Sequence, residues 1–270
     1  MKDRLRKITD KKWFSSLLWI VLLIIAWEIG ACVVAATKRT PENILPHLHQ
    51  IIAAVISSKS VTAGMTATQA VLYSAGLTLF RAFIGLALGA AFGFLSALIM
   101  KASGLVEKLL FPYLMLIQLI PVLGIAPIIL AITGDINVSR VVIAAILSFY
   151  PVAANTLAGF KSVEKEKYDL MFIYAAKARM LYSKVLIPAA SPYFFTGLKI
   201  AAPMAVTASI LVDTLQGDGG LGCLLSQSLK HAMSIYVFWI IVFFSAFIGI
   251  IISKIIGWVE LGVSPWKGRD

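Results

Sequence analysis

FKSVEKEKYDLMFIYAAKARMLYSKVLIPAASP, residues 160–192, is the longest polar interruption in an otherwise apolar sequence. Apolar runs long enough to cross a bilayer lie on both sides of it, so the segment must lie outside the hydrocarbon. Its apolar residues recur at three- and four-residue steps with charges between them, which predicts an amphipathic helix over about 163–182. We expect Ser162 near its start, and Pro188 and Pro192 at its end, because proline has no N–H with which to continue a helix.

The composition indicates a membrane protein. Apolar residues make up 60% of the 270 residues and the mean hydropathy is +0.90, whereas soluble domains are roughly half apolar. The two cysteines are isolated and fit neither a disulfide framework nor a zinc site. In a chain this apolar, the net charge of +11 indicates basic loops held on the cytoplasmic side rather than nucleic-acid binding.

Six apolar runs predict an all-α, polytopic membrane protein with about six transmembrane helices. The runs cover residues 17–34, 77–100, 109–132, 141–157, 193–215 and 237–259. They divide the chain into a basic N-terminus (1–16), a first span with an outer surface segment (17–69), a core (70–262) and a C-terminus (263–270). An even number of spans places both termini on one side. Of the 24 Lys and Arg residues, 18 fall in segments assigned to the cytoplasm, which favours cytoplasmic termini and a cytoplasmic segment 160–192.

The first span and the surface segment after it contain three ionisable residues of interest. Glu28 lies within the apolar run, where a charge is either functional or reaches water from the outer end of the helix, and both interpretations remain open. A short helix is expected over 44–56. His47 and His49 have no acidic neighbour in sequence, so we expect them to be solvated rather than metal ligands.

The second span carries a glycine every fourth residue, at Gly85, Gly89 and Gly93. This spacing puts the glycines on one face, where another helix backbone can approach closely. Dimerisation is one interpretation of such a stripe, and packing within the same subunit is the more common one.

The third span contains three prolines, Pro112, Pro121 and Pro127. Broken helices in membranes are tolerated where they line a cavity or pack in protein. We predict a translocation path at Gln118 and Pro121, faced by Met204 and Thr207 of the fifth span, which are three residues apart on one helical face. The alternative for Gln118 is a hydrogen bond to a carbonyl that Pro121 frees.

A short amphipathic helix between spans is either a solvated linker or a docking element. Residues 185–188 resemble the end of the cytoplasmic signature loop of inner-membrane subunits of binding-protein-dependent ABC importers. Counting back, the acidic start of that signature falls on Asp169 and its glycine on Ala175, while Leu170 and Met171 are bulkier than the usual alanines. The Ile-Pro and Ala-Pro pairs of the third span and the Gly-Leu-Gly turn after the fifth resemble the nitrate/sulfonate/taurine branch.

The resemblance implies the type I ABC importer permease fold, in a bacterial plasma or inner membrane. It implies a permease homodimer, ABC ATPase subunits that bind ATP and Mg, and a soluble or lipid-anchored substrate-binding protein. The helix that docks the ATPase would include Asp169, Ala175, Ala176, Lys177 and Ala178. In the implied mechanism, ATP closes the ATPase dimer and the permease alternates between inward- and outward-facing states.

No catalytic residue, cofactor, metal site or nucleic-acid partner is predicted in the chain itself. The glycine-dense stretch 216–222 lacks the GxxxxGK[ST] spacing of a nucleotide loop. An ion-coupled secondary transporter is the alternative, but it would place ionisable residues near mid-membrane, and here only Glu28 and Asp213 lie deep, both near an outer end. A structural membrane protein would not need a proline-broken span, and an intramembrane enzyme would need a Ser, His or Cys cluster.

Overall fold

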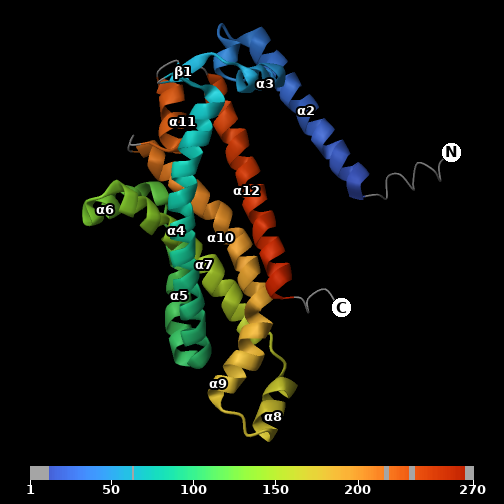
Figure 1. The fold of residues 1–270 in the computed structure, drawn as a ribbon, viewed down its shortest axis with the longest axis vertical. Coiled ribbons are helices and arrows are strands. Elements are labelled where there is room, and N and C mark those ends of the chain that lie inside the picture. The colour runs from blue at the N-terminus through green and yellow to red at the C-terminus, as the bar shows by residue number, and fades with distance from the viewer. Residues whose placement is uncertain (1–11, 63, 216–218, 231–234, 265–270) are drawn as a thin grey trace, which may run out of the picture. The chain divides into compact units, whose positions relative to one another are not determined.

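The computed structural model describes residues 12–62, 64–215, 219–230 and 235–264 of the chain, which fold almost entirely into helices (Figure 1). The chain divides into two compact units. Unit 1 comprises Met1–Val71 and Gln227–Ile241, and unit 2 comprises Leu72–Ser226 and Val242–Asp270. Residues 1–11 of the basic N-terminus predicted at 1–16, residues 265–270 of the C-terminus predicted at 263–270, and residues 216–218 of the glycine-dense loop lie outside the described residues.

Long apolar helices account for most of the chain and confirm the all-α polytopic prediction. Five of them are long and apolar enough to cross a membrane, and there are six if a bent pair counts as one span, among the residues that the structure describes. The five are α2 (Lys12–Thr37), α4 (Ala67–Ala102), α7 (Ile136–Lys161), α10 (Ile187–Leu215) with the short helices before it, and α12 (Ile235–Val263). The bent pair is α5 (Gly104–Leu119) and α6 (Val122–Thr133).

Unit 1 contains the segment predicted to lie on the outer surface. After α2 come a 3₁₀ turn, η1 (Pro41–Asn43), and α3 (Leu48–Ile56), which confirms a short helix here, although it begins four residues later than expected. Two short strands that were not predicted, β1 (Ser60–Thr62) and β2 (Met65–Thr66), then pair antiparallel. The helix α4 follows directly and so begins ten residues before the predicted span.

The glycine stripe of α4 packs against α7 inside unit 2. A Cβ atom on Gly85 would lie 2.5 Å from Ala144 Cβ, and one on Gly89 would lie 2.5 Å from the carbonyl oxygen of Ala145. One on Gly93 would be 2.8 Å from a backbone oxygen of α7. These distances leave no room for a side chain, so packing within the subunit is confirmed. α10 covers α7 with a run of small residues that includes Ala201.

The third predicted span is broken at its central proline. α5 ends at Leu119 and α6 begins at Val122, and the chain bends by 108° between Gly104–Leu119 and Gly124–Thr133. Pro121 takes an extended conformation between them, since it has no N–H to continue α5. Pro112 and Pro127 lie inside α5 and α6 without ending either helix.

The segment 160–192 differs from its prediction in three ways. Ser162 ends α7 instead of starting the next helix, and α8 (Lys165–Ile173) begins after Glu164. The single helix predicted over 163–182 is two helices, α8 and α9 (Ala178–Leu181).

The two prolines do not end a helix either. A π-helical turn, η2 (Tyr182–Leu186), joins α9 to α10, and the helix then continues past Pro188 and Pro192 to Leu215. The N–H of Ile187 bonds to the carbonyl of Tyr182, five residues back. This wider turn directly before Pro188 explains why the proline is tolerated, because π-bulges absorb breaks in the helical hydrogen-bond ladder.

Candidate functional site

The break between α8 and α9 falls on the position where the signature has glycine. Ala175 has φ 47°, in the left-handed region that favours glycine, and it is the only non-glycine residue with positive φ among those described. Backbone N–H groups of Ala175 and Ala176 bond back to the carbonyls of Phe172 and Met171, which closes the end of α8. The glycine of the signature therefore corresponds to a position with left-handed backbone conformation. The spacing of apolar and charged side chains could not predict this conformation.

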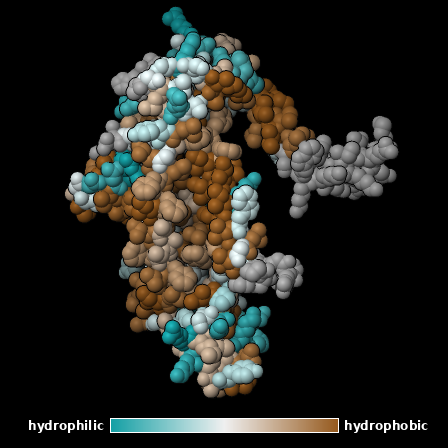
Figure 2. Space-filling model, viewed as in Figure 1, coloured by the Kyte–Doolittle hydropathy of each residue, from teal (hydrophilic) through white to brown (hydrophobic). Residues whose placement is uncertain are grey.

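Large apolar side chains project from this segment into solvent. Phe172 is 86% exposed, Ile173 77% and Tyr174 75%, and Leu170 and Met180 are also exposed. Hydrophilic residues gather at the end of unit 2 where α8 and α9 lie (Figure 2). Exposed apolar clusters rimmed by polar groups are typical of protein-binding surfaces.

The predicted docking residues share this surface. Asp169, Ala175, Lys177 and Ala178 are exposed, and Ala176 is half-buried. The base of the segment, in contrast, is tied to the spans. Val163 is buried in a core cluster with residues of α4, α5, α7 and α10.

Two electrostatic contacts hold the same base. The Lys101 ammonium group at the end of α4 lies 5.3 Å from the ring centroid of Tyr168 in α8, a cation–π contact. Lys161 at the end of α7 forms an ion pair with Glu107 of α5. A force on α8 would therefore reach several spans through direct contacts.

The predicted path residues do not line one cavity among the described residues. Gln118 is half-buried and Pro121 exposed at the α5–α6 break, whereas Met204 is half-buried and Thr207 exposed on α10. The side chain of Gln118 forms no hydrogen bond with any residue that the structure describes, so the alternative of a bond to a freed carbonyl is not observed.

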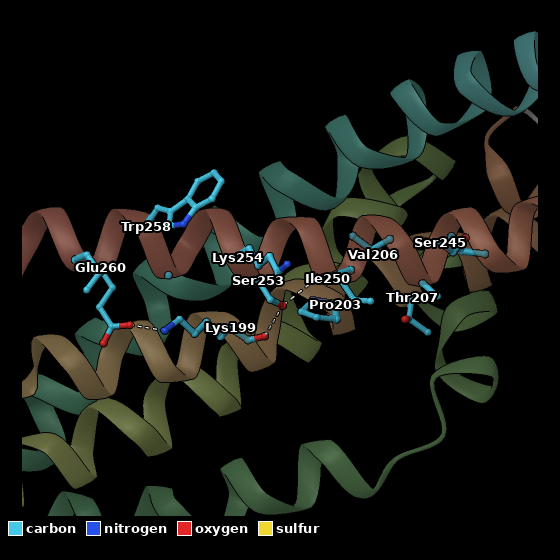
Figure 3. A pocket seen from close by; sticks show the side chains of 15 residues that line it. Lys199, Pro203, Val206, Thr207, Ser245, Ile250, Ser253, Lys254, Trp258 and Glu260 are labelled. Carbon is cyan, nitrogen blue, oxygen red and sulfur yellow. Dashed lines mark hydrogen bonds and ion pairs between the residues drawn. The ribbon is translucent and has the colours of Figure 1, made fainter. Parts of the chain in front are cut away.

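Thr207 borders a groove of about 1210 Å³ between α10 and α12 in unit 2. At one end of the groove, Lys199 of α10 forms an ion pair with Glu260 of α12 (Figure 3). The hydroxyl of Ser253 donates to the carbonyl of Lys199 at 3.5 Å and to that of Gly249 at 2.9 Å.

A cluster of buried charged residues joins α4, α7 and α10, and it was not predicted from the sequence. Asp213 accepts a hydrogen bond from Thr78 at 2.8 Å, and its Oδ1 lies 2.6 Å from Nε of Arg140 and 3.7 Å from Nη1 of Arg81. Asp213 and Arg140 are fully buried. Both arginines belong to the six Lys and Arg residues that were not assigned to the cytoplasm from the sequence.

The glycine-dense loop packs onto this cluster. The hydroxyl of Thr78 accepts the N–H of Leu221 at 2.9 Å, and Arg140 donates to the carbonyl of Gly219 at 3.3 Å. Gly220 has φ 103°, and a Cβ atom there would overlap the carboxylate of Asp213. The described part of the loop is thus a structural turn that covers a buried carboxylate.

Glu28 has a structural role in unit 1. Its carboxylate lies 2.6 Å from Nδ1 of His47 and accepts the N–H of Leu48 at 2.9 Å, so it caps the first turn of α3. The expectation that His47 is solvated for want of an acidic partner was therefore wrong. That partner lies in the preceding helix, and no group of three or more potential metal ligands occurs among the described residues.

Apolar spans, a proline-broken helix and a polar segment between two spans are the features expected of a membrane transport permease. The chain belongs to the family of binding-protein-dependent transport system inner membrane components, whose model matches residues 89–265. It falls in the nitrate/sulfonate branch of ABC importer permeases, as its relatives show.

One relative is the formylaminopyrimidine transport permease protein ThiX of Halalkalibacterium halodurans, 29% identical over 94% of this chain and 96% of that protein. Another is the putative aliphatic sulfonates transport permease protein SsuC of Bacillus subtilis, 24% identical over 98% and 93% of the two chains. A solved amino acid ABC transporter shares the fold with a TM-score of 0.61 at 20% identity, over 76% of this chain and 99% of that one. A structure of the MetNI methionine ABC transporter also has a TM-score of 0.61, at 14% identity, over 73% and 97% of the two chains. The type I importer fold expected from the sequence is thereby confirmed.

Proposed function

We propose that the chain is the permease subunit through which an ATP-driven importer couples a separate ABC ATPase to solute movement, with α8, α9 and the turn between them as the docking surface. The exposed apolar cluster of Leu170, Phe172, Ile173, Tyr174 and Met180 is the observation that carries this proposal. Burying such side chains against a partner contributes about 1.5–3 kcal/mol each. A solvated linker would gain nothing from holding them in water.

Coupling is the second element of the proposal. The docking surface is continuous with the spans through Val163 in the core cluster and through the Lys101–Tyr168 contact. Movement of the ATPase would therefore displace α4 and α7 together with α8. ATP and Mg would bind to the partner subunit, where hydrolysis takes place.

Membership of the family supports the rest of the proposal, which concerns the path and the remaining partners. Two copies of the permease would enclose a path that includes Gln118 and Pro121 at the α5–α6 break and the Met204–Thr207 face of α10. A binding protein, soluble or lipid-anchored, would deliver the solute on the side opposite α8. Both termini and α8 would be cytoplasmic, as the distribution of Lys and Arg favours.

The test is co-purification of the tagged full chain with an ABC ATPase expressed together with it. Replacing Ala175 with Arg should abolish capture of the ATPase and solute uptake without removing the protein from the membrane, because the alanine side chain is exposed. Ala102→Arg is the matched control, since Ala102 is also exposed but lies outside the docking surface, at the end of α4. Full ATPase capture by the Ala175 variant would remove the docking proposal.

A further inference from the structure

The groove between α10 and α12 has an apolar part and a charged end. Pro203, Val206 and Ile210 of α10 face Ala246 and Ile250 of α12 along its length. Lys199, Lys254 and Glu260 line it toward the end of α12, together with Trp258 (Figure 3). A groove between two spans with an apolar part and a charged end fits an amphiphile better than a wholly polar or wholly apolar ligand.

The charges at this end do not balance. Two lysines and one glutamate line the groove, which leaves one positive charge in excess. Glu260 is engaged by Lys199 and its side chain is only 5% exposed. Lys254 is exposed and forms no ion pair with any residue that the structure describes. A ligand group with one negative charge would complement it.

The charged end also lies at the depth of lipid headgroups. Trp258 is five residues from the end of α12 at Val263, which is about 8 Å at 1.5 Å per residue. Trp and Lys near the ends of spans are typical of the membrane interface. Lys254 and Trp258 are four residues apart and therefore project from the same side of α12.

The length of the groove matches one leaflet. From Lys254, where the positive charge in excess lies, to Ser245, which lines the far end, the helix rises about 14 Å. Half of a hydrocarbon core of about 30 Å is about 15 Å, so one acyl chain below a headgroup fills this length. Exposure of Ile250 and Trp258 on the side of the groove leaves it open to the bilayer.

We propose that this groove binds an anionic phospholipid, with the phosphodiester at Lys254 beside the Lys199–Glu260 pair and an acyl chain against Pro203, Val206 and Ile250. Basic pockets between spans on the cytoplasmic side commonly bind acidic lipid headgroups. This site is separate from the ATPase-docking surface and does not depend on it. The acyl chain lies beside the Met204–Thr207 face of α10 that is proposed for the path, since Thr207 only borders the groove. Occupancy by lipid stabilises the contact between α10 and α12.

The experiment uses the full chain purified in detergent, with phosphatidylglycerol or phosphatidylcholine added as probes. Binding is measured by native mass spectrometry and by the shift in thermal midpoint. We expect phosphatidylglycerol to bind the wild type more tightly, and Lys254→Gln to weaken its binding about fivefold. Lys108→Gln is the matched control, because Lys108 is exposed and unpaired among the described residues but lies on α5.

A second variant tests the acyl-chain part. A Cβ atom at Gly249 would be 3.8 Å from Pro203, so Gly249→Leu fills the groove without forcing the helices apart, and it should reduce binding of both lipids. Lys199 is left unchanged because its loss would remove the ion-pair partner of a buried Glu260 and destabilise the site for another reason. Equal binding of the two lipids by the wild type, or unchanged phosphatidylglycerol binding by the Lys254 variant, would overturn the proposal. So would a disulfide between two copies of an Ile250→Cys variant, which would show that a second permease fills the groove.

Discussion

Nε of Arg140 lies 2.6 Å from Oδ1 of Asp213, and both side chains are completely buried. Arg81 approaches the same carboxylate, and Thr78 donates a hydrogen bond to it. A single carboxylate thus joins α4, α7 and α10 and supports the loop that follows α10. Such a cluster gives little net stability compared with apolar packing, but it is costly to break, because a lone buried charge has no compensation.

We predict that Asp213→Asn lowers the stability of the protein by about 3–5 kcal/mol, the cost of leaving buried arginine charge without its carboxylate. The thermal midpoint in detergent measures this effect. Asp169→Asn, at an exposed carboxylate of α8, should leave the midpoint unchanged and serves as the control. Equal midpoints for the two variants would mean that the cluster carries no such cost.

The glycine stripe gives a second prediction. Gly89→Ala places a Cβ atom 2.5 Å from the carbonyl oxygen of Ala145, so α4 and α7 must separate, at a cost of about 1–3 kcal/mol. The same substitution at Gly104 is the control, since nothing lies within 4 Å of a Cβ atom there. A fall in thermal midpoint for both variants, or for neither, would contradict close packing as the cause.

The spans and the glycine stripe could be predicted from sequence because each depends on a local pattern. An apolar run of about 20 residues or a glycine every fourth residue restricts the structure whatever the rest of the chain does. The buried cluster could not be predicted in this way. Asp213 and Arg140 meet only because their two helices are rotated to face each other, and an arginine near the end of a span looks the same in sequence whether it reaches water or a carboxylate.

The segment 160–192 shows the same limit on a smaller scale. Proline ends most helices, and that rule predicted an end at Pro188. The structure instead widens the turn before it, and a π turn has no distinct sequence pattern. Ala175 stands where the signature has glycine, and its left-handed backbone conformation could not be predicted from the spacing of residues in the sequence.

Ala175→Gly should therefore stabilise the turn between α8 and α9. Left-handed φ costs a non-glycine residue roughly 1–2 kcal/mol, and glycine loses about 0.5–1 kcal/mol through the entropy of the unfolded chain, so a gain of about 0.5–1 kcal/mol remains. Slower proteolytic cleavage within residues 174–177 would measure this gain in stability. Ala178→Gly, at the first residue of α9, should make the segment more susceptible. Faster cleavage of the Ala175 variant would show that its conformation is not strained.

Glu28 allows a test confined to unit 1. Removing its carboxylate by Glu28→Ala leaves the N–H of Leu48 in the first turn of α3 without its acceptor, at a cost of about 1 kcal/mol, while the contact between His47 and Gln50 remains. Amide hydrogen exchange in Leu48–Ile56 should become about fivefold faster. Glu42→Ala provides the comparison, because Glu42 accepts a hydrogen bond from Tyr236 and not from α3. Unchanged exchange after Glu28→Ala would show that α3 is held by other contacts.

The path hypothesis is best tested at Gln118. An amide facing lipid would leave its polar groups unsatisfied at a cost of about several kcal/mol, and Gln118 has no hydrogen-bond partner among the described residues. It should therefore face water or a partner subunit at the α5–α6 break.

We first replace Cys32 and Cys223 with Ser and Ala. We then introduce Gln118→Cys or, as a lipid-facing control, Leu119→Cys, whose position is 75% exposed in the isolated chain. A small, polar, membrane-permeant thiol reagent should modify position 118 much faster than position 119, at a rate that changes when ATP and a binding protein are added to the assembled transporter. A cysteine at 118 that stays inert in every nucleotide state would place Gln118 outside the path.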